Sequence, residues 1–240
     1  TAGDFDNDSH QDFLAHGNTG SLTFFKGDGA GHFKAQMQDG LEWRSRGLDT
    51  ADFDHDGSRD LVRAAYSSGN LRYYKGLGDG TFGTYSQIAD VGDDPYAVTA
   101  GDFDLDGHPD VMVNAGSSGD IRFFKGLGNG TFTTGVAVAT LDINRHSAFD
   151  AYDFDGDGDL DIVTATYDAR SILFFRNDGT GTNFAAAVSV GTTPNNVMCI
   201  AAPPHLPSAF LPSAAPTGAV PTVADTTLFY GETEAVNGFW

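Results

Sequence analysis

The chain has 240 residues, of which 40% are hydrophobic and 12% aromatic, and this is enough to bury the core of one domain or two. Asp and Glu number 33 against 13 Lys and Arg, and the net charge of −20 disfavours binding to nucleic acid or to anionic lipid. No apolar run reaches the roughly 18 residues of a membrane span, the first residues show no signal-peptide pattern, and the single Cys199 excludes an intrachain disulfide and a Cys-based zinc cluster.

Three motifs recur four times along the chain, roughly 50 residues apart. The first is an Asp-rich segment that runs into apolar residues, at 3–13, 51–61, 101–111 and 152–162. The second is an apolar and aromatic run, at 22–27, 71–76, 121–126 and 172–177. The third is a Gly-rich turn ending in Phe, at 29–33, 78–82, 128–132 and 179–184. Three aligned motifs in four copies establish an internal repeat.

Each repeat is predicted to consist of β-strands, because its apolar runs are short, rich in β-branched and aromatic residues, and bounded by Gly, Ser, Asn and Asp. No longer window shows the apolar stripe of a helix. In the third repeat the predicted strands are 96–103, 110–115, 120–125 and 131–141. Four strands in roughly 50 residues predict one blade of an all-β propeller built from four-stranded antiparallel sheets.

Adjacent aromatic residues in the second motif, such as Phe123 and Phe124, point to opposite faces of a strand. Blades that pack on both sides of a sheet would cover both rings, so we expect these aromatics in the core. A platform for stacking sugars is the alternative.

Residues 193–240 are interpreted as a degenerate fifth blade without an Asp-rich segment. Residues 195–201 resemble a first strand, 227–231 the aromatic strand and 237–240 the closing turn, while the Pro-rich stretch 203–222 is predicted to be a long loop. The chain is therefore interpreted as one domain, 1–240, with four loop-bearing blades in 1–192. Both a five-bladed ring and a fragment of a six- or seven-bladed ring fit, and an open ring would expose strand edges for self-association.

The Asp-rich segments share the pattern D-x-D-x-D-G-x-x-D, with carboxylates at positions 1, 3, 5 and 9. Ca²⁺ takes about six to eight oxygens, and a tight loop can point alternate carboxylates at one centre, with the backbone carbonyl of position 7 as a further ligand. Three loops have Gly at position 6, where it permits a sharp turn, but the first loop has Ser9, so that site is expected to be distorted or weak. Acidic turns that cap backbone amides are the alternative, but they do not explain four aspartates in the same places four times. An EF-hand is excluded because position 12 is never Glu.

These loops, the strand after each and the Gly-rich turn resemble the FG-GAP or VCBS repeat family over residues 1 to about 192. They are similar to the integrin α-subunit propeller and to fungal and bacterial propeller lectins. The resemblance implies that each loop joins the first two strands of a blade and holds Ca²⁺, in about four sites. Carried over position by position, the side-chain ligands are Asp4, Asp6, Asp8 and Asp12; Asp52, Asp54, Asp56 and Asp60; Asp102, Asp104, Asp106 and Asp110; and Asp153, Asp155, Asp157 and Asp161. The residues at position 7 are His10, Ser58, His108 and Asp159.

Bound calcium would account for much of the acidity. Four Ca²⁺ ions would bring the net charge from −20 to about −12. Because the assembled site does not exist in the unfolded chain, metal binding and folding are expected to be coupled, and a chelator is expected to lower the melting temperature substantially.

No catalytic constellation is visible, and we expect no enzymatic activity. The seven histidines are scattered, and metalloprotease, P-loop and nucleophile-elbow motifs are absent. Cys199 lies among apolar residues and is interpreted as a buried thiol. A propeller enzyme could still assemble a site from separate blades.

Two classes of function remain. The first is an extracellular Ca²⁺-binding recognition module, for a glycan or another extracellular or cell-surface ligand; the second is a scaffold or the propeller portion of a larger secreted enzyme such as a polysaccharide lyase. Extracellular residence is inferred from the metal, since cytosolic Ca²⁺ is too scarce to fill weak sites. The candidate ligand-binding residues, for which hairpin turns or core packing are the alternative, are Trp43, Tyr66, Asn70, Asp120, Tyr167 and Arg170.

Overall fold

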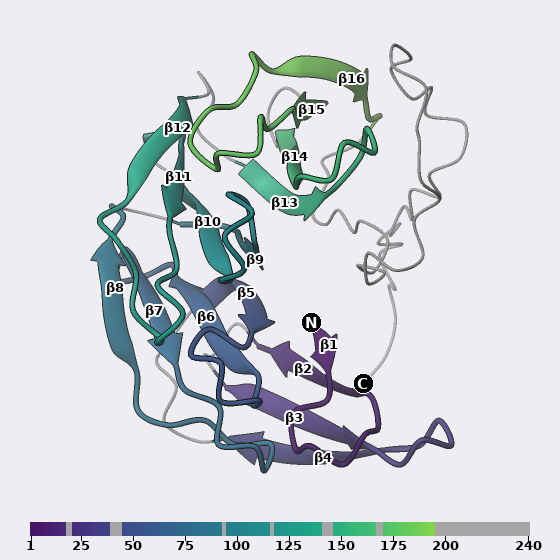
Figure 1. Ribbon diagram of the computed structural model, residues 1–240. Helices are drawn as coiled ribbons and strands as arrows, with labels where there is room; N and C mark the ends of the chain where they lie inside the picture. Colours follow the sequence, from purple (N-terminus) through teal and green to yellow (C-terminus); the bar gives the residue numbers. More distant parts are fainter. Residues whose placement is uncertain are drawn as a thin grey trace.

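The computed structural model describes residues 1–17, 21–38, 45–92, 95–115, 118–140, 146–166 and 170–194. Its regular elements are the strands β1 to β16, which form four four-stranded antiparallel sheets, each made of four consecutive strands. The sheets follow one another around an arc, with the first strand of each toward the centre and the fourth at the periphery (Figure 1). The predicted all-β propeller of four-stranded antiparallel blades is confirmed.

The strands of each blade succeed one another from the centre outward. Blade 1 contains β1 (Ala2–Gly3), β2 (Asp12–His16), β3 (Leu22–Gly27) and β4 (Phe33–Gln38). Blade 2 contains β5 (Ser45–Ala51), β6 (Asp60–Ala65), β7 (Asn70–Tyr74) and β8 (Ser86–Asp90). Blade 3 contains β9 (Val98–Gly101), β10 (Asp110–Ala115), β11 (Asp120–Phe124) and β12 (Val136–Thr140). Blade 4 contains β13 (His146–Tyr152), β14 (Asp161–Thr166), β15 (Ser171–Phe175) and β16 (Val188–Thr192).

The second and third strands of blade 3 match the sequence prediction, whereas the first strand, β9, is two residues shorter at each end than the predicted 96–103, and the fourth starts later than predicted. β10 covers the predicted 110–115, and β11 ends one residue before the predicted 125. The fourth strand was expected from residue 131, but β12 begins at Val136. The intervening residues close a turn instead, with a bridge between Gly126 and Phe132, and this turn docks on the preceding blade as described below.

The core consists of hydrophobic clusters that lie between consecutive blades. The cluster between blades 2 and 3 includes Phe53, Tyr73 and Phe124, and the cluster between blades 3 and 4 includes Phe103 and Phe123. Phe123 and Phe124 therefore face different neighbouring blades, and both are almost fully buried. This confirms that these adjacent aromatics belong to the core, as their alternation along the strand predicted.

The Gly-rich turns fasten each blade to the one before it. Gly80 of blade 2 donates its N–H to the carbonyl of Phe5 in blade 1 at 2.9 Å, and Gly130 of blade 3 donates to Phe53 in blade 2 at 3.0 Å. Each acceptor is position 2 of an Asp loop, so the repeat motifs interlock from blade to blade.

The degenerate fifth blade was predicted for residues 193–240, and all but Thr193 and Pro194 of this segment lie outside the described residues. The described residues include no helix able to cross a membrane.

Candidate functional site

The Asp loops connect the first and second strands of every blade, and all four have the same backbone path. Position 4 has a positive φ in each loop, as in Leu105 (60°) and His55 (56°). Position 6 also has a positive φ, between 88° and 100° in the three glycines, and Ser9 of blade 1 takes up the same left-handed region at 69°. The sharp turn that glycine was expected to permit is therefore present in all four loops, including the one that lacks glycine.

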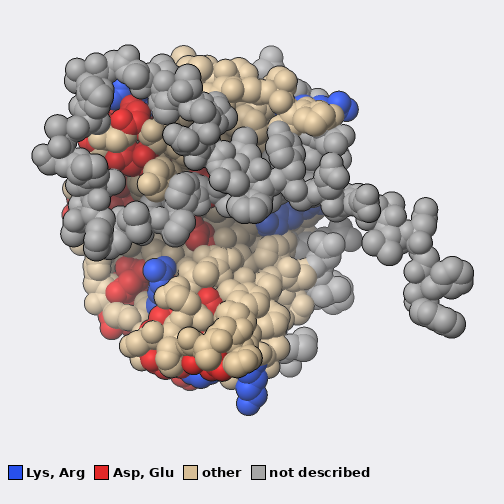
Figure 2. All heavy atoms as spheres, turned by 90° about the vertical axis from the view of Figure 1, so that its right-hand side faces the viewer, with Lys and Arg blue, Asp and Glu red and all other residues tan. Residues whose placement is uncertain are grey.

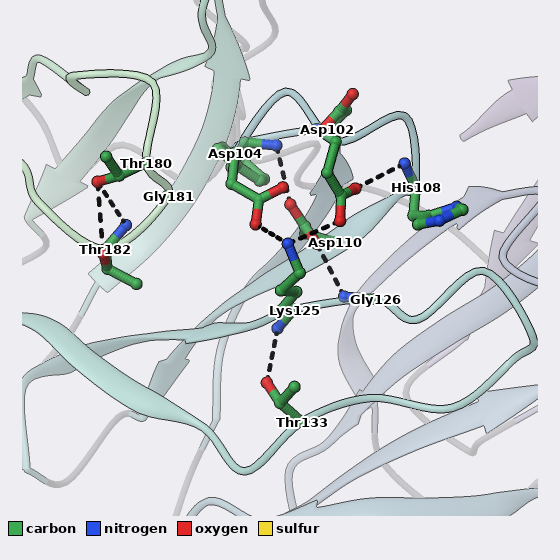
Figure 3. Close-up of polar contacts among 12 residues, drawn as sticks. Asp102, Asp104, His108, Asp110, Lys125, Gly126, Thr133, Thr180, Gly181 and Thr182 are labelled. Carbon is green, nitrogen blue, oxygen red and sulfur yellow. Dashed lines mark hydrogen bonds and ion pairs between the residues drawn. The ribbon is translucent and has the colours of Figure 1, made fainter.

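Positions 1 and 9 are carboxylates held by backbone amides. In blade 3, Asp102 accepts the N–H groups of Asp106 and Gly107 at 3.0 and 2.9 Å. Asp110 accepts the N–H groups of Phe103 and Gly126 at 3.0 and 2.8 Å, and Figure 3 shows the bond from Gly126. The same four bonds recur in the other three loops. The backbone thus holds the carboxylates of positions 1 and 9 in the same place in every loop. This accounts for the constant spacing of these two aspartates in the four repeats.

Positions 3 and 5 face a basic side chain that lies at the end of the third strand of the same blade, or directly after it. In blade 3 the Lys125 ammonium contacts Asp104 and lies 2.6 Å from Asp106 Oδ2. Figure 3 shows Lys125 reaching up toward Asp104, with Asp110 beside them. This lysine was not among the predicted site residues, although a basic residue stands at the same place in all four repeats.

The carboxylates converge closely enough to share a cation. In blades 2, 3 and 4, one oxygen from each of positions 1, 3 and 9 lies within 4.8 Å of the others, and in blade 1 the three residues are positions 1, 3 and 5. One oxygen of position 3, Oδ1, is buried without a hydrogen-bond partner in Asp6, Asp104 and Asp155. A buried carboxylate oxygen without a donor is costly unless a cation supplies the missing interaction. The residues present therefore fit an oxygen-ligated divalent cation.

Burial raises the pKa of the position-9 carboxyls. It brings the pKa of Asp60 to about 6 and those of Asp110 and Asp161 to about 7. The bonds from backbone amides oppose this rise but do not cancel it, because the side chains are almost fully shielded from water. These carboxyls hold a proton more tightly than an exposed Asp does, and a cation would compete with that proton.

The residues at position 7 differ between blades. His10 and His108 each donate a backbone N–H to the position-5 carboxylate of their own loop, at 2.9 Å in both cases. Across the junction of blades 2 and 3, His55 Nε2 and His108 Nδ1 lie 2.7 Å apart. Asp159 of blade 4 is buried, and burial together with nearby Asp157 raises its pKa to about 6. The backbone carbonyl at position 7 remains a predicted ligand.

Acidic side chains gather along one side of the molecule in Figure 2. The loops of all blades lie at the same end of their sheets, because each follows the first strand. The opposite end of the sheets carries the turns between second and third strands, and there the described candidate ligand-binding residues lie: Tyr66, Asn70, Asp120 and Arg170.

At that opposite end, Tyr66 packs against Arg46 and Tyr96, which were not among the predicted site residues. The Arg46 guanidinium carbon lies 4.3 Å from the centre of the Tyr66 ring and 4.6 Å from that of Tyr96. The two rings are 5.4 Å apart at an interplanar angle of 70°. Arg46 is exposed and both tyrosines are half-buried. We call Arg46, Tyr66 and Tyr96 the aromatic–arginine cluster; it spans the junction of blades 2 and 3.

The other candidate ligand residues do not join this cluster. The Asp120 carboxylate accepts a bond from the Thr140 hydroxyl, and its backbone N–H donates to the Ser118 hydroxyl oxygen. Arg170 donates to the carbonyl of Pro194, so both residues support their own blade's turns. Asn70 begins β7 opposite Asp90. Trp43 and Tyr167 lie outside the described residues. No sequence signal links Arg46, Tyr66 and Tyr96, because they come from three separate segments.

Comparison with known proteins places these features in context. The family model of the FG-GAP-like repeat matches four times, at residues 4–63, 52–113, 112–164 and 153–202. No curated protein matches the chain. A lectin from Agrocybe aegerita that specifically recognises non-reducing terminal N-acetylglucosamine is similar in structure, with a TM-score of 0.59 and 20% identity over 78% of this chain and 50% of the lectin. The biofilm matrix protein Bap1 of V. cholerae is similar with a TM-score of 0.45 and 18% identity over 78% of this chain and 27% of Bap1. The chain thus spans about half the length of the lectin.

Proposed function

The chain belongs to the FG-GAP-like repeat family, and we propose that it is a non-catalytic, Ca²⁺-binding β-propeller that recognises a glycan outside the cell. The Asp loops would hold the metal, and the aromatic–arginine cluster would contact the ligand. The two sites lie at opposite ends of the blades, so metal binding would stabilise the scaffold on which the ligand site is built.

Calcium is supported by the chemistry of the donor set. Each loop offers only oxygens, from four carboxylates and from backbone carbonyls, and Ca²⁺ prefers oxygen ligands in flexible geometry. The buried, unpartnered Oδ1 of Asp6, Asp104 and Asp155 would become a ligand atom. Bound Ca²⁺ would supply positive charge that draws the carboxylates of a loop together.

Calcium titration tests this part of the proposal. We expect Ca²⁺ to raise the melting temperature of chelated protein, with half-saturation at roughly 10⁻⁴ to 10⁻³ M, the range of extracellular modules. Mg²⁺, which keeps its water and demands a smaller octahedral site, is expected to act more weakly. Melting curves that coincide in excess EDTA and in millimolar Ca²⁺ would refute calcium binding, and submicromolar affinity would contradict the extracellular assignment.

Glycan recognition is supported chiefly by the aromatic–arginine cluster. Tyrosine rings pack against the apolar faces of sugars while their hydroxyls remain in water, and a guanidinium offers donors to sugar hydroxyls or carboxylates. Arg46 lies at the start of β5 and the Asp loop follows the end of that strand, so the two sites are separated by about 20 Å of extended chain. The similarity to the lectin supports the fold on which such a site would be carried.

A glycan array followed by calorimetry tests this site. We expect Tyr66→Ala and Tyr96→Ala each to weaken binding of the best array ligand by roughly tenfold or more, in line with the loss of a buried aromatic contact. Tyr85→Ala is the matched control, because Tyr85 also packs on an arginine, at 4.1 Å from Arg72, but lies elsewhere on blade 2. Equal losses in all three variants, or none, would contradict the assignment. Release of products from the bound glycan would contradict the non-catalytic role.

A further inference from the structure

In every blade one basic side chain, at the end of the third strand or directly after it, contacts the Asp loop of the same blade. Lys26 Nζ lies 2.6 Å from Asp8 Oδ2, and Lys75 Nζ lies 2.6 Å from Asp56 Oδ2. In blade 4 an arginine takes this role, with Arg176 Nε 2.6 Å from Asp155 and Nη2 2.7 Å from Asp157. In every blade the cation contacts both position 3 and position 5. We call these four side chains the loop cations: Lys26, Lys75, Lys125 and Arg176.

The backbone next to each loop cation fixes its position. In blade 3 the following residue, Gly126, donates its N–H to Asp110 at 2.8 Å. A side chain at Gly126 would run into the carbonyl of Pro109, so the end of β11 lies directly against the base of the loop. This contact leaves Lys125, one residue earlier, directed at Asp104 and Asp106. Gly27 and Gly76 make the same close approach in blades 1 and 2.

Position 3 depends on the loop cation more than the other carboxylates do. The side chain of Asp104 is only 12% exposed, its Oδ1 has no hydrogen-bond partner, and its Oδ2 contacts Lys125. Asp102 and Asp110, by contrast, each accept two backbone N–H groups. Without a cation of some kind, Asp104 would be a shielded charge with no compensating partner, which is strongly unfavourable.

Calcium and the loop cation need the same oxygens. Of the eight carboxylate oxygens in the blade 3 loop, five accept backbone N–H groups, and Lys125 contacts two more, one each from Asp104 and Asp106. Ca²⁺ needs about six to eight oxygens, so it requires more than the one left without a partner. The five bonds from backbone N–H groups are fixed by the fold. The two contacts with Lys125 come from a side chain that can move away, so these two oxygens can be freed for calcium.

We propose that the loop cations are built-in counter-cations, which hold positions 3 and 5 together in the metal-free protein and leave those carboxylates when Ca²⁺ binds. The holding role rests on the ion pairs alone, whereas the release rests on the proposed calcium binding. The metal-free propeller would then remain folded, and calcium would bind more weakly than to the same loop without the basic residue, because each ion must displace an ammonium or a guanidinium.

Substitution of Lys75 tests both parts. Lys75→Met keeps an unbranched side chain only one atom shorter and removes its charge, while Lys75→Arg keeps a cation and reproduces the arrangement of Arg176. In excess EDTA we expect Lys75→Met to melt roughly 5 °C below wild type and Lys75→Arg to melt close to it. In saturating Ca²⁺ the deficit of Lys75→Met should largely disappear, and half-stabilisation should need roughly tenfold less calcium than in wild type. Lys34→Met, which removes the same charge from an exposed position on β4, should leave both values unchanged.

Each part can fail separately. Equal melting temperatures of Lys75→Met and wild type in EDTA would overturn the holding role. If calcium does not reduce the difference in melting temperature between Lys75→Met and wild type, the proposed release of the loop cation on calcium binding is overturned. If wild type itself shows no response to calcium, the proposed metal function fails, while the comparison in EDTA still decides the holding role.

A measurement on the wild-type chain covers the case in which Lys75→Met does not fold. In protein labelled with ¹⁵N-lysine, the ammonium groups of the three loop lysines should give slowly exchanging signals in EDTA, and the exposed Lys34 should not. Calcium should abolish this protection. Rapid exchange of all four lysines in EDTA, or protection that survives saturating calcium, would refute the proposal.

Discussion

Position 6 of the first Asp loop shows how a single residue can depart from the repeat while the backbone does not. Ser9 has a φ of 69°, in the left-handed region where a β-carbon is unfavourable. Its N–H still donates to Asp4 at 2.8 Å, like that of glycine in the other loops. The strain is therefore tolerated because the loop's hydrogen bonds and its neighbouring strands determine the turn.

Ser9→Gly is expected to stabilise the protein by about 1 kcal/mol, because it removes this left-handed strain at an exposed position. Chemical unfolding in EDTA measures the change without a contribution from metal. The reverse substitution in blade 2, Gly57→Ser, should destabilise by a similar amount, since nothing within 4 Å would hinder the new side chain and only the backbone strain remains. A Ser9→Gly variant no more stable than wild type would show that the strain is relieved in another way.

Asp49 joins three blades near the centre of the propeller. Its carboxylate accepts the N–H of Ala100 in blade 3 at 2.9 Å and the hydroxyl of Thr1 in blade 1 at 3.3 Å. Burial raises its pKa above the usual range, with a further contribution from the charge of Asp150. The ionised Asp49 carboxylate thus accepts hydrogen bonds from two other blades, but its burial costs free energy of folding.

The raised pKa gives Asp49 a defined effect on the pH dependence of stability. The folded protein binds this proton more tightly than the unfolded chain, so the contribution of Asp49 to stability falls as the pH rises from about 4 through its folded pKa. Asn at this position does not titrate. The stability of Asp49→Asn relative to wild type should therefore increase steadily between pH 4 and pH 7, as measured by chemical unfolding in EDTA. A pH-independent difference would show that the carboxyl does not titrate in this range.

At the scale of the element, the Gly-rich turn is the device that locks one blade to the next. A β-carbon on Gly80 would overlap the ring of Phe24 in blade 1, and one on Gly130 would lie 2.9 Å from the Tyr73 hydroxyl in blade 2. Blade 4 has a longer turn, and there the side chain of Asn177 donates to the carbonyl of Phe103 at 2.8 Å. The inter-blade bond is thus kept even where a side-chain amide has to replace the backbone one.

Gly80→Ala is expected to be much more destabilising than Gly92→Ala. Both glycines have a positive φ, of 81° and 85°, so both substitutions incur a backbone strain of about 1 kcal/mol. Only at Gly80 does the new methyl group also collide with a buried ring, which should add about 1–3 kcal/mol. Chemical unfolding gives both values. Equal losses would mean that the turn does not pack against blade 1.

In the molecule as a whole, the Asp loops and the proposed ligand site lie at opposite ends of the blades. Acidic side chains gather on one side (Figure 2), and the aromatic–arginine cluster lies at the end of the sheets opposite the Asp loops. Gly47 helps to form this second site, because a β-carbon there would lie 2.7 Å from the backbone nitrogen of Val98. The close approach of β5 and β9 brings Arg46 next to Tyr96.

The proposed metal sites should compete with protons. Asp60, Asp110 and Asp161 have pKa values raised to about 6, 7 and 7, mainly by burial, and each proton must leave before its carboxylate can bind a cation. Calcium affinity should therefore fall as the pH is lowered from 7.5 to 5.5, and binding at pH 6.5 should release protons. Calorimetry in two buffers of different ionisation enthalpy detects that release. Equal heats in both buffers would contradict it.

The repeat, the all-β blades and the grouping of the aspartates could be predicted from the amino-acid sequence, because these features depend on short-range spacing. Alternation along a strand places Phe123 and Phe124 on opposite faces, and loop spacing converges Asp102, Asp104 and Asp110 whatever the surroundings. Because these patterns recur four times, they can be recognised from the sequence alone.

Contacts between segments that are far apart in the chain became visible only in the folded structure. Arg46, Tyr66 and Tyr96 come together because two inner strands pack through a glycine, and no periodicity in the chain records that contact. The late start of β12 was likewise unpredictable, since the preceding turn is held by another blade. Lys125 was visible in the motif, but its direction toward Asp104 depends on how β11 is anchored to the loop. Contacts across the sheet and between blades depend on packing, which local spacing does not encode.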